Sequence, residues 1–143
     1  MLVGSVRKVN NDKSGLSISL GEHELQQIDS TKYLGVTLDS SLNWNDHVLK
    51  LCSQISRKLS ALRRSSKIAN ESLLNEMYNS NILPVMEYGC SVWGNWSVSH
   101  NNMIYRLQKR AARIVSGNYD FVNVSGDDLL SELKWTPFVE RVR

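Results

Sequence analysis

The chain has 143 residues, of which 41% are hydrophobic and 22% are charged, and its net charge is +3. This length matches one ordinary domain and this composition can bury a core, which excludes a wholly disordered chain. Two cysteines are too few for a disulfide-stapled secreted scaffold, and apolar runs of four or five residues are too short to cross a membrane. The sequence therefore indicates a small intracellular protein, nuclear or cytoplasmic, without a signal peptide.

The positive charge is concentrated in the middle of the chain. Residues 50–113 contain ten lysine and arginine residues against three glutamates, a net charge of +7. Residues 1–49 and residues 114–143 each carry a net charge of −2. A polyanion is therefore the first partner to test.

The N-terminal region contains three strand-like segments. Leu16, Ile18 and Leu20 alternate with serines, which is the period-2 pattern of a strand with one buried face. Residues 24–28 are a weaker candidate, and residues 32–38 are rich in β-branched and aromatic residues. The short polar links between these segments predict an antiparallel meander that needs a covering layer.

After the strands, the hydrophobic period changes to three and four residues, which predicts helices. An amphipathic helix is expected over about residues 46–66, with Asn43 or Asn45 as its N-cap. A second helix is expected to begin after the N-cap Asn70 and to end or kink near Pro84.

Two further helices are expected towards the C-terminus. One begins between residues 97 and 99 and ends at a C-terminal cap, Gly117, and the other is a turn or two over residues 127–133. Residues 88–96 are aromatic and punctuated by glycines, which is typical of a packed turn. The charged end after Phe138 favours a chain that stops before a further element.

These elements predict an α+β fold that is mainly α, with a short antiparallel β meander followed by a helical bundle. We expect three segments. They are a β meander over residues 1–40, a helical bundle over residues 41–117, and a C-terminal connector with a short helix over residues 118–143.

The basic residues fall on the polar sides of the expected helices. A solvated helix face would explain either cluster alone. Two nearly acid-free faces in one bundle favour contact with a phosphate backbone. The candidate residues are Lys50, Arg57, Lys58, Arg63, Arg64, Lys67, Arg106, Lys109, Arg110 and Arg113.

One acidic pair resembles a catalytic motif. Asp127-Asp128 follows Gly126, as in the Gly-Asp-Asp boxes that hold metal ions in nucleic-acid polymerases. Such a box needs a tight hairpin between apolar strands, whereas this pair precedes an amphipathic helical pattern. A helix cap at Ser125 or Asp127, with acids in the first turn, explains the pair, and we favour it over catalysis.

The histidines and one cysteine suggest no site. His23, His47 and His100 lack a second ligand at the spacing of a zinc site, and we expect them to be surface or half-buried residues. Cys52 lies on the apolar stripe of its helix and is expected to be buried.

Three aromatic residues allow two interpretations. Tyr88, Trp93 and Trp96 have rings that could stack on nucleic-acid bases. Their apolar neighbours favour core packing instead.

Several short motifs follow one another along the chain. They are the tract from Lys32 to Asp39, Leu42-Asn43-Trp44 with His47, Tyr78, Ile82-Leu83-Pro84, Tyr88-Gly89, Val92-Trp93-Gly94, and the tract from Leu107 to Ile114. Each is weak alone, but their order and spacing from about residue 16 to residue 139 resemble the reverse transcriptases of non-LTR (LINE-like) retrotransposons, just past the catalytic palm.

This resemblance implies a piece of a polymerase. Tyr33, Leu34, Gly35 and Val36 match the family's primer grip, a β-hairpin that positions the primer end. Residues 46–116 match its thumb, a helical bundle that lies along the template–primer duplex. The family's Mg²⁺-binding aspartates lie upstream of these motifs, so we expect a fragment with no catalytic residue and no cofactor of its own.

The implied partner is an RNA–DNA hybrid or another nucleic-acid duplex, bound through its backbone without sequence preference, and not a membrane. Two alternatives stay open. One is a helical interaction module whose basic faces bind an acidic protein, and the other is the C-terminal part of a complete reverse transcriptase. Gly35 would let the backbone approach another chain closely, or would merely permit close strand packing.

Overall fold

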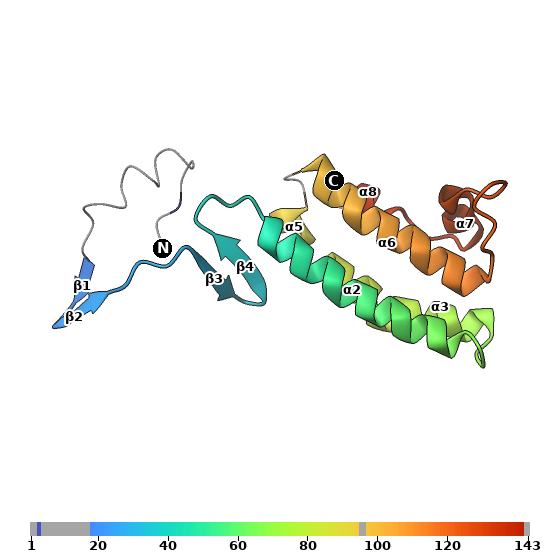
Figure 1. Cartoon of the computed structure of the whole chain (residues 1–143), viewed down its shortest axis with the longest axis horizontal. Helices are drawn as coiled ribbons and strands as arrows, with labels where there is room; N and C mark the ends of the chain where they lie inside the picture. Colours follow the sequence, from blue (N-terminus) through green and yellow to red (C-terminus); the bar gives the residue numbers. More distant parts are fainter. Residues whose placement is uncertain (1–2, 4–17, 95–96, 142–143) are drawn as a thin grey trace. The chain divides into compact units, whose positions relative to one another are not determined.

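The structure, a computed structural model, describes residues 3, 18–94 and 97–141 (Figure 1). Within these residues short strands precede a series of helices, which confirms an α+β fold that is mainly α.

The contacts within the chain divide it into two units. We call residues 1–47 the strand unit and residues 48–143 the helical unit. Three segments, with boundaries after residues 40 and 117, were expected. The difference at the second boundary arises because the segment after residue 117 packs against the helices before it.

The strand unit contains two antiparallel β-hairpins. β1 (Ile18–Leu20) pairs with β2 (His23–Leu25), and β3 (Ser30–Tyr33) pairs with β4 (Val36–Asp39). Within residues 18–47 the two hairpins form separate sheets, which corrects the expectation of three strands in one meander.

The expected strand over residues 32–38 is interrupted by a tight turn. Leu34 and Gly35 have φ angles of 45° and 81°, and they are the two residues between the paired Tyr33 and Val36. Positive φ at both central residues is the geometry of a two-residue hairpin turn, and glycine favours it at the second position. Gly35 therefore serves a turn, which neither interpretation from the sequence anticipated.

Asp39 organises the entry into α2 (Asn45–Ser65). Its carboxylate accepts hydrogen bonds from the backbone N–H groups of Ser41, Asn43 and Trp44 at 3.0–3.2 Å. Partial burial opposes the charge of Asp39, but these bonds and the Ser41 hydroxyl hold its pKa below the usual value. The Asn43 Oδ1 atom in turn accepts the N–H of Asn45 at 2.9 Å, at the first residue of the helix.

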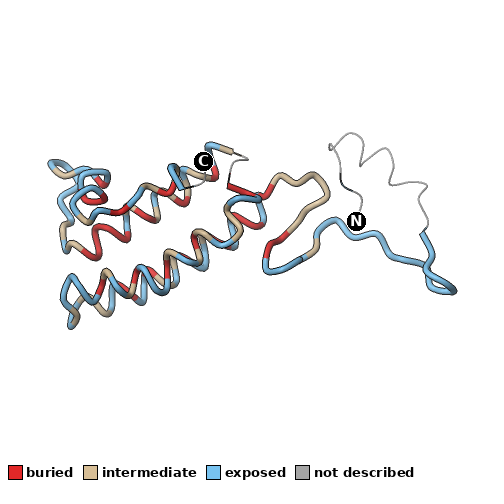
Figure 2. The backbone as a smooth tube through the Cα atoms, turned by 180° about the vertical axis from the view of Figure 1, so that it is seen from behind, coloured by how far each residue is buried: buried red, intermediate tan, exposed pale blue. Residues whose placement is uncertain are grey.

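The helical unit contains the rest of α2 and six further helices in the described residues. They are α3 (Glu71–Asn81), α4 (Leu83–Glu87), α5 (Cys90–Trp93), α6 (Val98–Ser116), α7 (Gly126–Glu132) and α8 (Phe138–Arg141). α3 lies against α4 and α6, and α7 and α8 pack on α6. Buried residues recur along α2 and α6 at helical spacing (Figure 2).

The expected helix boundaries at Asn70, Pro84 and Gly117 are confirmed. Asn70 caps α3 by accepting the N–H of Leu73 at 3.0 Å, and Gly117 ends α6 in the left-handed conformation. Pro84 lies in the first turn of α4, where its missing N–H costs no helical hydrogen bond, so α3 ends before it.

The C-terminal segment contributes aromatic side chains to the core. The ring of Trp135 stacks on that of Tyr78 with centroids 3.7 Å apart, and its Nε1–H donates to Asn75 at 2.8 Å. The ring of Phe138 lies 6.0 Å from that of Trp93, and both side chains are fully buried. These contacts join α3 to Trp135 and α5 to α8, and burial of the rings stabilises this packing.

Two expectations about aromatic residues had different outcomes. Trp93 is buried, which confirms core packing, whereas Tyr88 is 58% exposed, so core packing is wrong for Tyr88. Trp96 lies outside the described residues.

The polar candidates also differ from expectation in part. His47 and His100 are buried rather than at the surface, and His23 is exposed. His47 is buried where its Nδ1 atom accepts the backbone N–H of Thr37 at 3.3 Å. Cys52 is half-buried, and this burial raises the pKa of its thiol.

Candidate nucleic-acid interface

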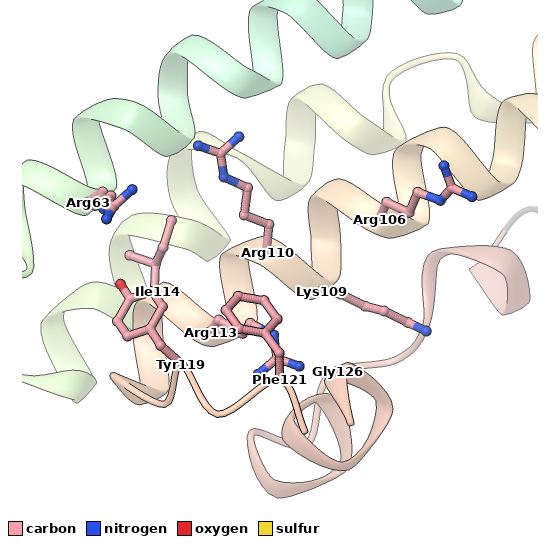
Figure 3. Close-up of a pocket in the computed structure, with 9 residues that line it drawn as sticks. All are labelled: Arg63, Arg106, Lys109, Arg110, Arg113, Ile114, Tyr119, Phe121 and Gly126. Atoms are coloured by element: carbon pink, nitrogen blue, oxygen red, sulfur yellow. The ribbon is translucent and has the colours of Figure 1, made fainter. Parts of the chain in front are cut away.

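Basic and aromatic side chains of the helical unit surround one pocket, which we call the basic pocket (Figure 3). α2, α6, the loop after α6 and the start of α7 all contribute to it. Its lining residues are Arg63, Arg106, Lys109, Arg110, Arg113, Ile114, Tyr119, Phe121 and Gly126. The pocket has a volume of about 460 Å³, and none of its lining residues is acidic.

Three arginines give the basic pocket its free positive charge. Arg63 of α2 and Arg106 and Arg110 of α6 are exposed. Among the described residues, no carboxylate oxygen lies within 4 Å of these three guanidinium groups. Their uncompensated charge is suited to attract a phosphate group.

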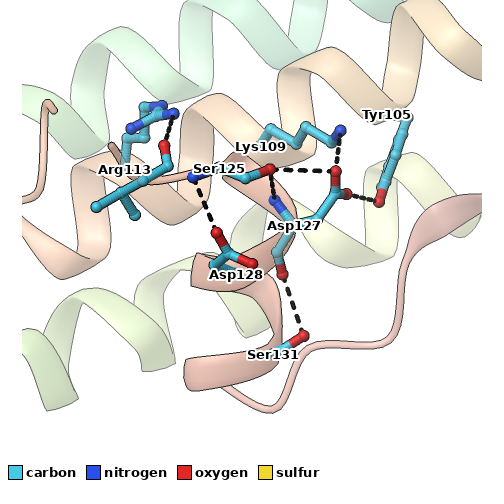
Figure 4. Close-up of polar contacts among 8 residues, drawn as sticks. Tyr105, Lys109, Arg113, Ser125, Asp127, Asp128 and Ser131 are labelled. Carbon is cyan, nitrogen blue, oxygen red and sulfur yellow. Dashed lines mark hydrogen bonds and ion pairs between the residues drawn. The ribbon is translucent and has the colours of Figure 1, made fainter. Parts of the chain in front are cut away.

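Lys109 is already paired. Its Nζ atom lies 2.7 Å from the Oδ2 atom of Asp127, and the same carboxylate accepts a hydrogen bond from the hydroxyl of Tyr105 (Figure 4). Lys109 and then Tyr105 hold the pKa of Asp127 below its usual value. Burial, followed by the bond to Asp127, raises the pKa of Tyr105 to about 12.

The side chain of Arg113 is buried and hydrogen-bonds to the backbone of the loop after α6. We expected it on the polar side of α6, but it is only 8% exposed. Its Nη1 atom donates to the carbonyl oxygen of Asp120 at 3.0 Å and its Nη2 atom donates to that of Val124 at 2.8 Å. The returning loop covers this side of the helix, so Arg113 binds the backbone of the loop.

The loop after α6 is also held by its own side chains. The carboxylate of Asp120 accepts the N–H groups of Val122 and Asn123 at 2.9 and 3.0 Å, and the Asn123 side-chain amide at 2.8 Å. These bonds, led by the one from the backbone of Asn123, lower the pKa of Asp120. Hydrogen bonds from Arg113 and to Asp120 therefore hold the backbone of this loop from Asp120 to Val124.

Three of the remaining candidates form a second basic surface, which we call the outer face. Lys50, Arg57 and Arg64 follow one another at intervals of seven residues and are exposed. Seven residues are about two helical turns, so these side chains share one side of α2, opposite the buried Ile55. Lys58 is half-buried beside Asn81 of α3, and Lys67 is exposed just after α2.

The acidic pair is a helix cap, as the sequence favoured. Ser125 is the N-cap of α7, and its hydroxyl accepts the N–H of Asp127 at 3.2 Å. The carboxylate of Asp128 accepts the N–H of Ser125 at 3.0 Å, which completes a capping box (Figure 4). Within residues 18–94 and 97–141, no group of three or more His, Cys, Asp or Glu side chains could hold a metal ion.

The tract that resembles a primer grip lies at the tip of the β3–β4 hairpin. Tyr33 at the end of β3 and Leu34 in the turn are exposed, Gly35 is the second turn residue, and Val36 is buried. The resemblance implied a β-hairpin at this position, and the structure contains one. Its tip presents two large apolar side chains to solvent.

Sequence reasoning missed Tyr119 and Phe121, which line the basic pocket. They lie outside any helical period, so no amphipathic pattern points to them. A signal was nevertheless present, because two aromatic residues lie in a short loop directly after a basic helix, where no helical period assigns them to the core.

No helix in the part of the chain that the structure describes has the length and apolar character needed to cross a membrane.

Comparisons with known proteins find several relatives of one kind, the RNA-directed DNA polymerases of mobile elements. No family model matches the chain, and no solved structure matches it significantly. The probable RNA-directed DNA polymerase from transposon X-element of Drosophila melanogaster is 30% identical over 109 residues, which are 73% of this chain and 12% of that protein. Of the same organism, the RNA-directed DNA polymerase from mobile element jockey is 30% identical over 118 residues (79% and 13%), and the probable enzyme from transposon BS is 30% identical over 95 residues (64% and 10%). The chain thus spans only about a tenth to an eighth of the length of these relatives.

Proposed function

We propose a function from the premise that this chain is related to the RNA-directed DNA polymerases of non-LTR retrotransposons. The helical unit acts as a thumb-like segment that binds the backbone of a template–primer duplex, an RNA–DNA hybrid in the first instance. The hairpin tip at Tyr33, Leu34, Gly35 and Val36 acts as a primer-grip-like element. Binding is independent of base sequence because it is directed at phosphates.

The observation that carries this proposal is the set of three arginines in the basic pocket that have no carboxylate partner among the described residues. Arg106 and Arg110 are one helical turn apart on α6, and Arg63 reaches the same pocket from α2. Guanidinium groups bind phosphate oxygens in a planar, often bidentate geometry, and they release the counterions of the nucleic acid when they do so. No acidic residue lines the pocket, and the neighbouring carboxylate of Asp127 is engaged by Lys109 and Tyr105.

Two of the ten candidate cations are removed from direct contact. The charge of Lys109 is engaged by Asp127, and Arg113 is buried under its loop. The outer face and the residues Lys58 and Lys67 remain as secondary contacts that add to the general positive field.

A salt titration with matched variants tests the proposal. Affinity for a short blunt RNA–DNA hybrid is measured by fluorescence anisotropy over a range of salt concentrations. In the pocket variant, Arg63, Arg106 and Arg110 are all replaced by Gln. In the matched control, Lys50, Arg57 and Arg64 are replaced by Gln, which removes the same charge from the outer face.

The pocket variant should lower the slope of log affinity against log salt by about 3, and the control by clearly less, because each phosphate contact contributes about 0.9 to the slope. Equal losses in both variants would show that only the general charge matters. Affinity that does not change with salt would remove the phosphate contact altogether. A chain that ignores the hybrid at low salt but forms a defined oligomer would favour the helical interaction module instead.

We also propose that this chain alone does not extend primers. The family uses Mg²⁺, but the carboxylates of Asp127 and Asp128 do not fit a magnesium site, because one is paired with Lys109 and the other caps α7. Primer extension in the presence of Mg²⁺ tests this directly. Synthesis that depends on Mg²⁺ and is abolished by Asp127→Asn would overturn the assignment of the pair as a cap, and synthesis that survives this variant would point to other carboxylates of the chain.

A further inference from the structure

The loop between α6 and α7 presents two aromatic rings beside the arginines of the basic pocket. Phe121 is 73% exposed and Tyr119 is 46% exposed, although both are large side chains with apolar surface. Asn118, Asp120 and Asn123 in the same loop hydrogen-bond within the loop, and Val122, which follows Phe121, is itself 91% exposed. The rings therefore contribute little to the core and remain available to a ligand.

These rings are held in place before any ligand arrives. The guanidinium group of Arg113 donates hydrogen bonds to the carbonyl oxygens of Asp120 and Val124. The carboxylate of Asp120 accepts hydrogen bonds from the backbone N–H groups of Val122 and Asn123. A ring on a fixed loop loses less conformational entropy on binding than a ring on a flexible one. The geometry is thus preorganised for contact with a flat partner.

Each ring is also accompanied by a cation. The guanidinium carbon of Arg113 lies 4.3 Å from the centroid of Phe121, and that of Arg63 lies 5.9 Å from the centroid of Tyr119. A guanidinium that lies over one face of a ring leaves the opposite face available for stacking by another planar group. Arg106 and Arg110 supply unpaired positive charge in the same pocket (Figure 3).

We propose that the basic pocket binds an unpaired nucleotide of a single-stranded segment that flanks the duplex. Its base stacks on Tyr119 and Phe121, and its phosphate binds Arg106 and Arg110. This inference rests on the proposed function and names the ligand of the same site. The combination of exposed rings and unpaired cations matches a nucleotide, which has both a π face and an anion. The volume of about 460 Å³ also lies within the range of about 300–1,000 Å³ that is usual for small-ligand sites.

Stacking distinguishes an unpaired base from a duplex. Within a duplex both faces of each base are covered by neighbouring bases, so a protein ring reaches a base face only at an end or in a single strand. The outer face of α2, which presents cations without aromatic rings, offers phosphate contact alone. The basic pocket should therefore discriminate between paired and unpaired nucleotides, and the outer face should not.

Three hybrids of equal duplex length test this inference with the full chain. The first is blunt, the second carries a short single-stranded overhang of deoxyadenosine, and the third carries an abasic overhang with the same number of phosphates. Wild-type protein is compared with a double variant, Tyr119→Leu with Phe121→Leu, which keeps the charge and the apolar character of the loop. Tyr88→Leu, at an exposed ring outside the pocket, is the matched control.

The deoxyadenosine overhang should bind at least about fivefold more tightly than the abasic overhang, since one base–ring stack contributes that much or more. The double variant should lose this difference and keep its affinity for the blunt hybrid, and Tyr88→Leu should keep the difference. Equal binding of the two overhangs by the wild-type protein would overturn the inference, as would a difference that survives in the double variant.

The proposed function can fail separately. If the blunt hybrid does not bind at low salt, a deoxyadenosine oligonucleotide and its abasic counterpart repeat the comparison without a duplex. A base-dependent difference that the double variant removes would then support the nucleotide site and refute the thumb-like function. No binding of any probe would refute both, and would leave the exposed rings to the apolar surface of a protein partner.

Discussion

Gln108 should be a large single contributor to the stability of the helical unit. It lies on α6, is 1% exposed, and uses both ends of its side-chain amide. Its Nε2 atom donates to the carbonyl oxygen of Thr136 at 2.9 Å, and its Oε1 atom accepts the N–H of Phe138 at 2.7 Å. Replacement by leucine keeps much of the volume and removes both hydrogen bonds.

The substitution would cost different amounts of free energy at the two backbone groups, the N–H of Phe138 and the carbonyl of Thr136. The buried N–H of Phe138 would lose its acceptor, which costs about 1–3 kcal/mol for an unsatisfied buried donor. The carbonyl of Thr136 would keep a second partner, the Nε atom of Arg141 at 3.2 Å, so its loss is about 0.5–1.5 kcal/mol. We therefore expect Gln108→Leu to lower the free energy of unfolding by about 2–4 kcal/mol.

Urea denaturation followed by tryptophan fluorescence measures this change, and amide hydrogen exchange locates it. The amide of Phe138 should exchange faster, and Gln54→Leu, at an exposed position of α2, is the control with the same change of side chain. A loss below about 0.5 kcal/mol, or unchanged exchange at Phe138, would refute the view that this amide ties down the C-terminal segment.

Three further predictions follow from the packing of α7 and the turn of the second hairpin. Gly126→Ala should destabilise the helical unit, because the added Cβ would lie 2.9 Å from Cβ, Cγ and Cδ of Lys109. Thermal unfolding measures this change, and an unchanged midpoint would mean that α7 can shift to make room for the methyl group. Asp127 has a lowered pKa in the folded state, so its contribution should be complete above its unfolded pKa of about 3.9 and be lost as the pH falls through the lower folded pKa. The stability difference between wild type and Asp127→Asn should therefore be constant from about pH 5 to 8 and shrink below about pH 4, and a difference that grows there would contradict the ion pair. Gly35→Ala should lower the stability of the β3–β4 hairpin by about 1–2 kcal/mol, because a residue with a Cβ is strained at a φ of 81°. Hydrogen-exchange protection in β3 and β4 should fall, whereas equal protection would show that the turn tolerates a side chain.

The helices were predictable because their signals are local and repeated. The stripe of apolar residues along α2 and the caps at Asn70 and Gly117 are properties of neighbouring residues, and the structure contains each of them. The hairpins were less predictable. The residue pattern over residues 32–38 looks continuous, although the family resemblance implied a β-hairpin there, and the backbone angles of Leu34 and Gly35 show where the stretch bends.

The sequence predicted which helices carry the basic residues, but it did not predict which of these residues line the basic pocket. Helical periodicity placed Arg106, Arg110 and Arg113 on one polar side of α6. Arg113 is nevertheless buried, because a loop far from any periodic pattern returns over it. The aromatic part of the pocket, Tyr119 and Phe121, depends on the same loop and was missed for the same reason.

The aromatic contacts of the C-terminal segment have a consequence for synthesis of the chain on the ribosome. Trp135 donates its hydrogen bond to Asn75, 60 residues earlier, and Phe138 packs on Trp93. Until residues 135–138 leave the exit tunnel, Tyr78 and Trp93 have no stacking partner, and the nascent helices expose apolar surface to other chains. This core is therefore completed only after residues 135–138 have left the tunnel, and a chain that terminated between α6 and α8 would be an aggregation-prone species instead of a shorter stable bundle.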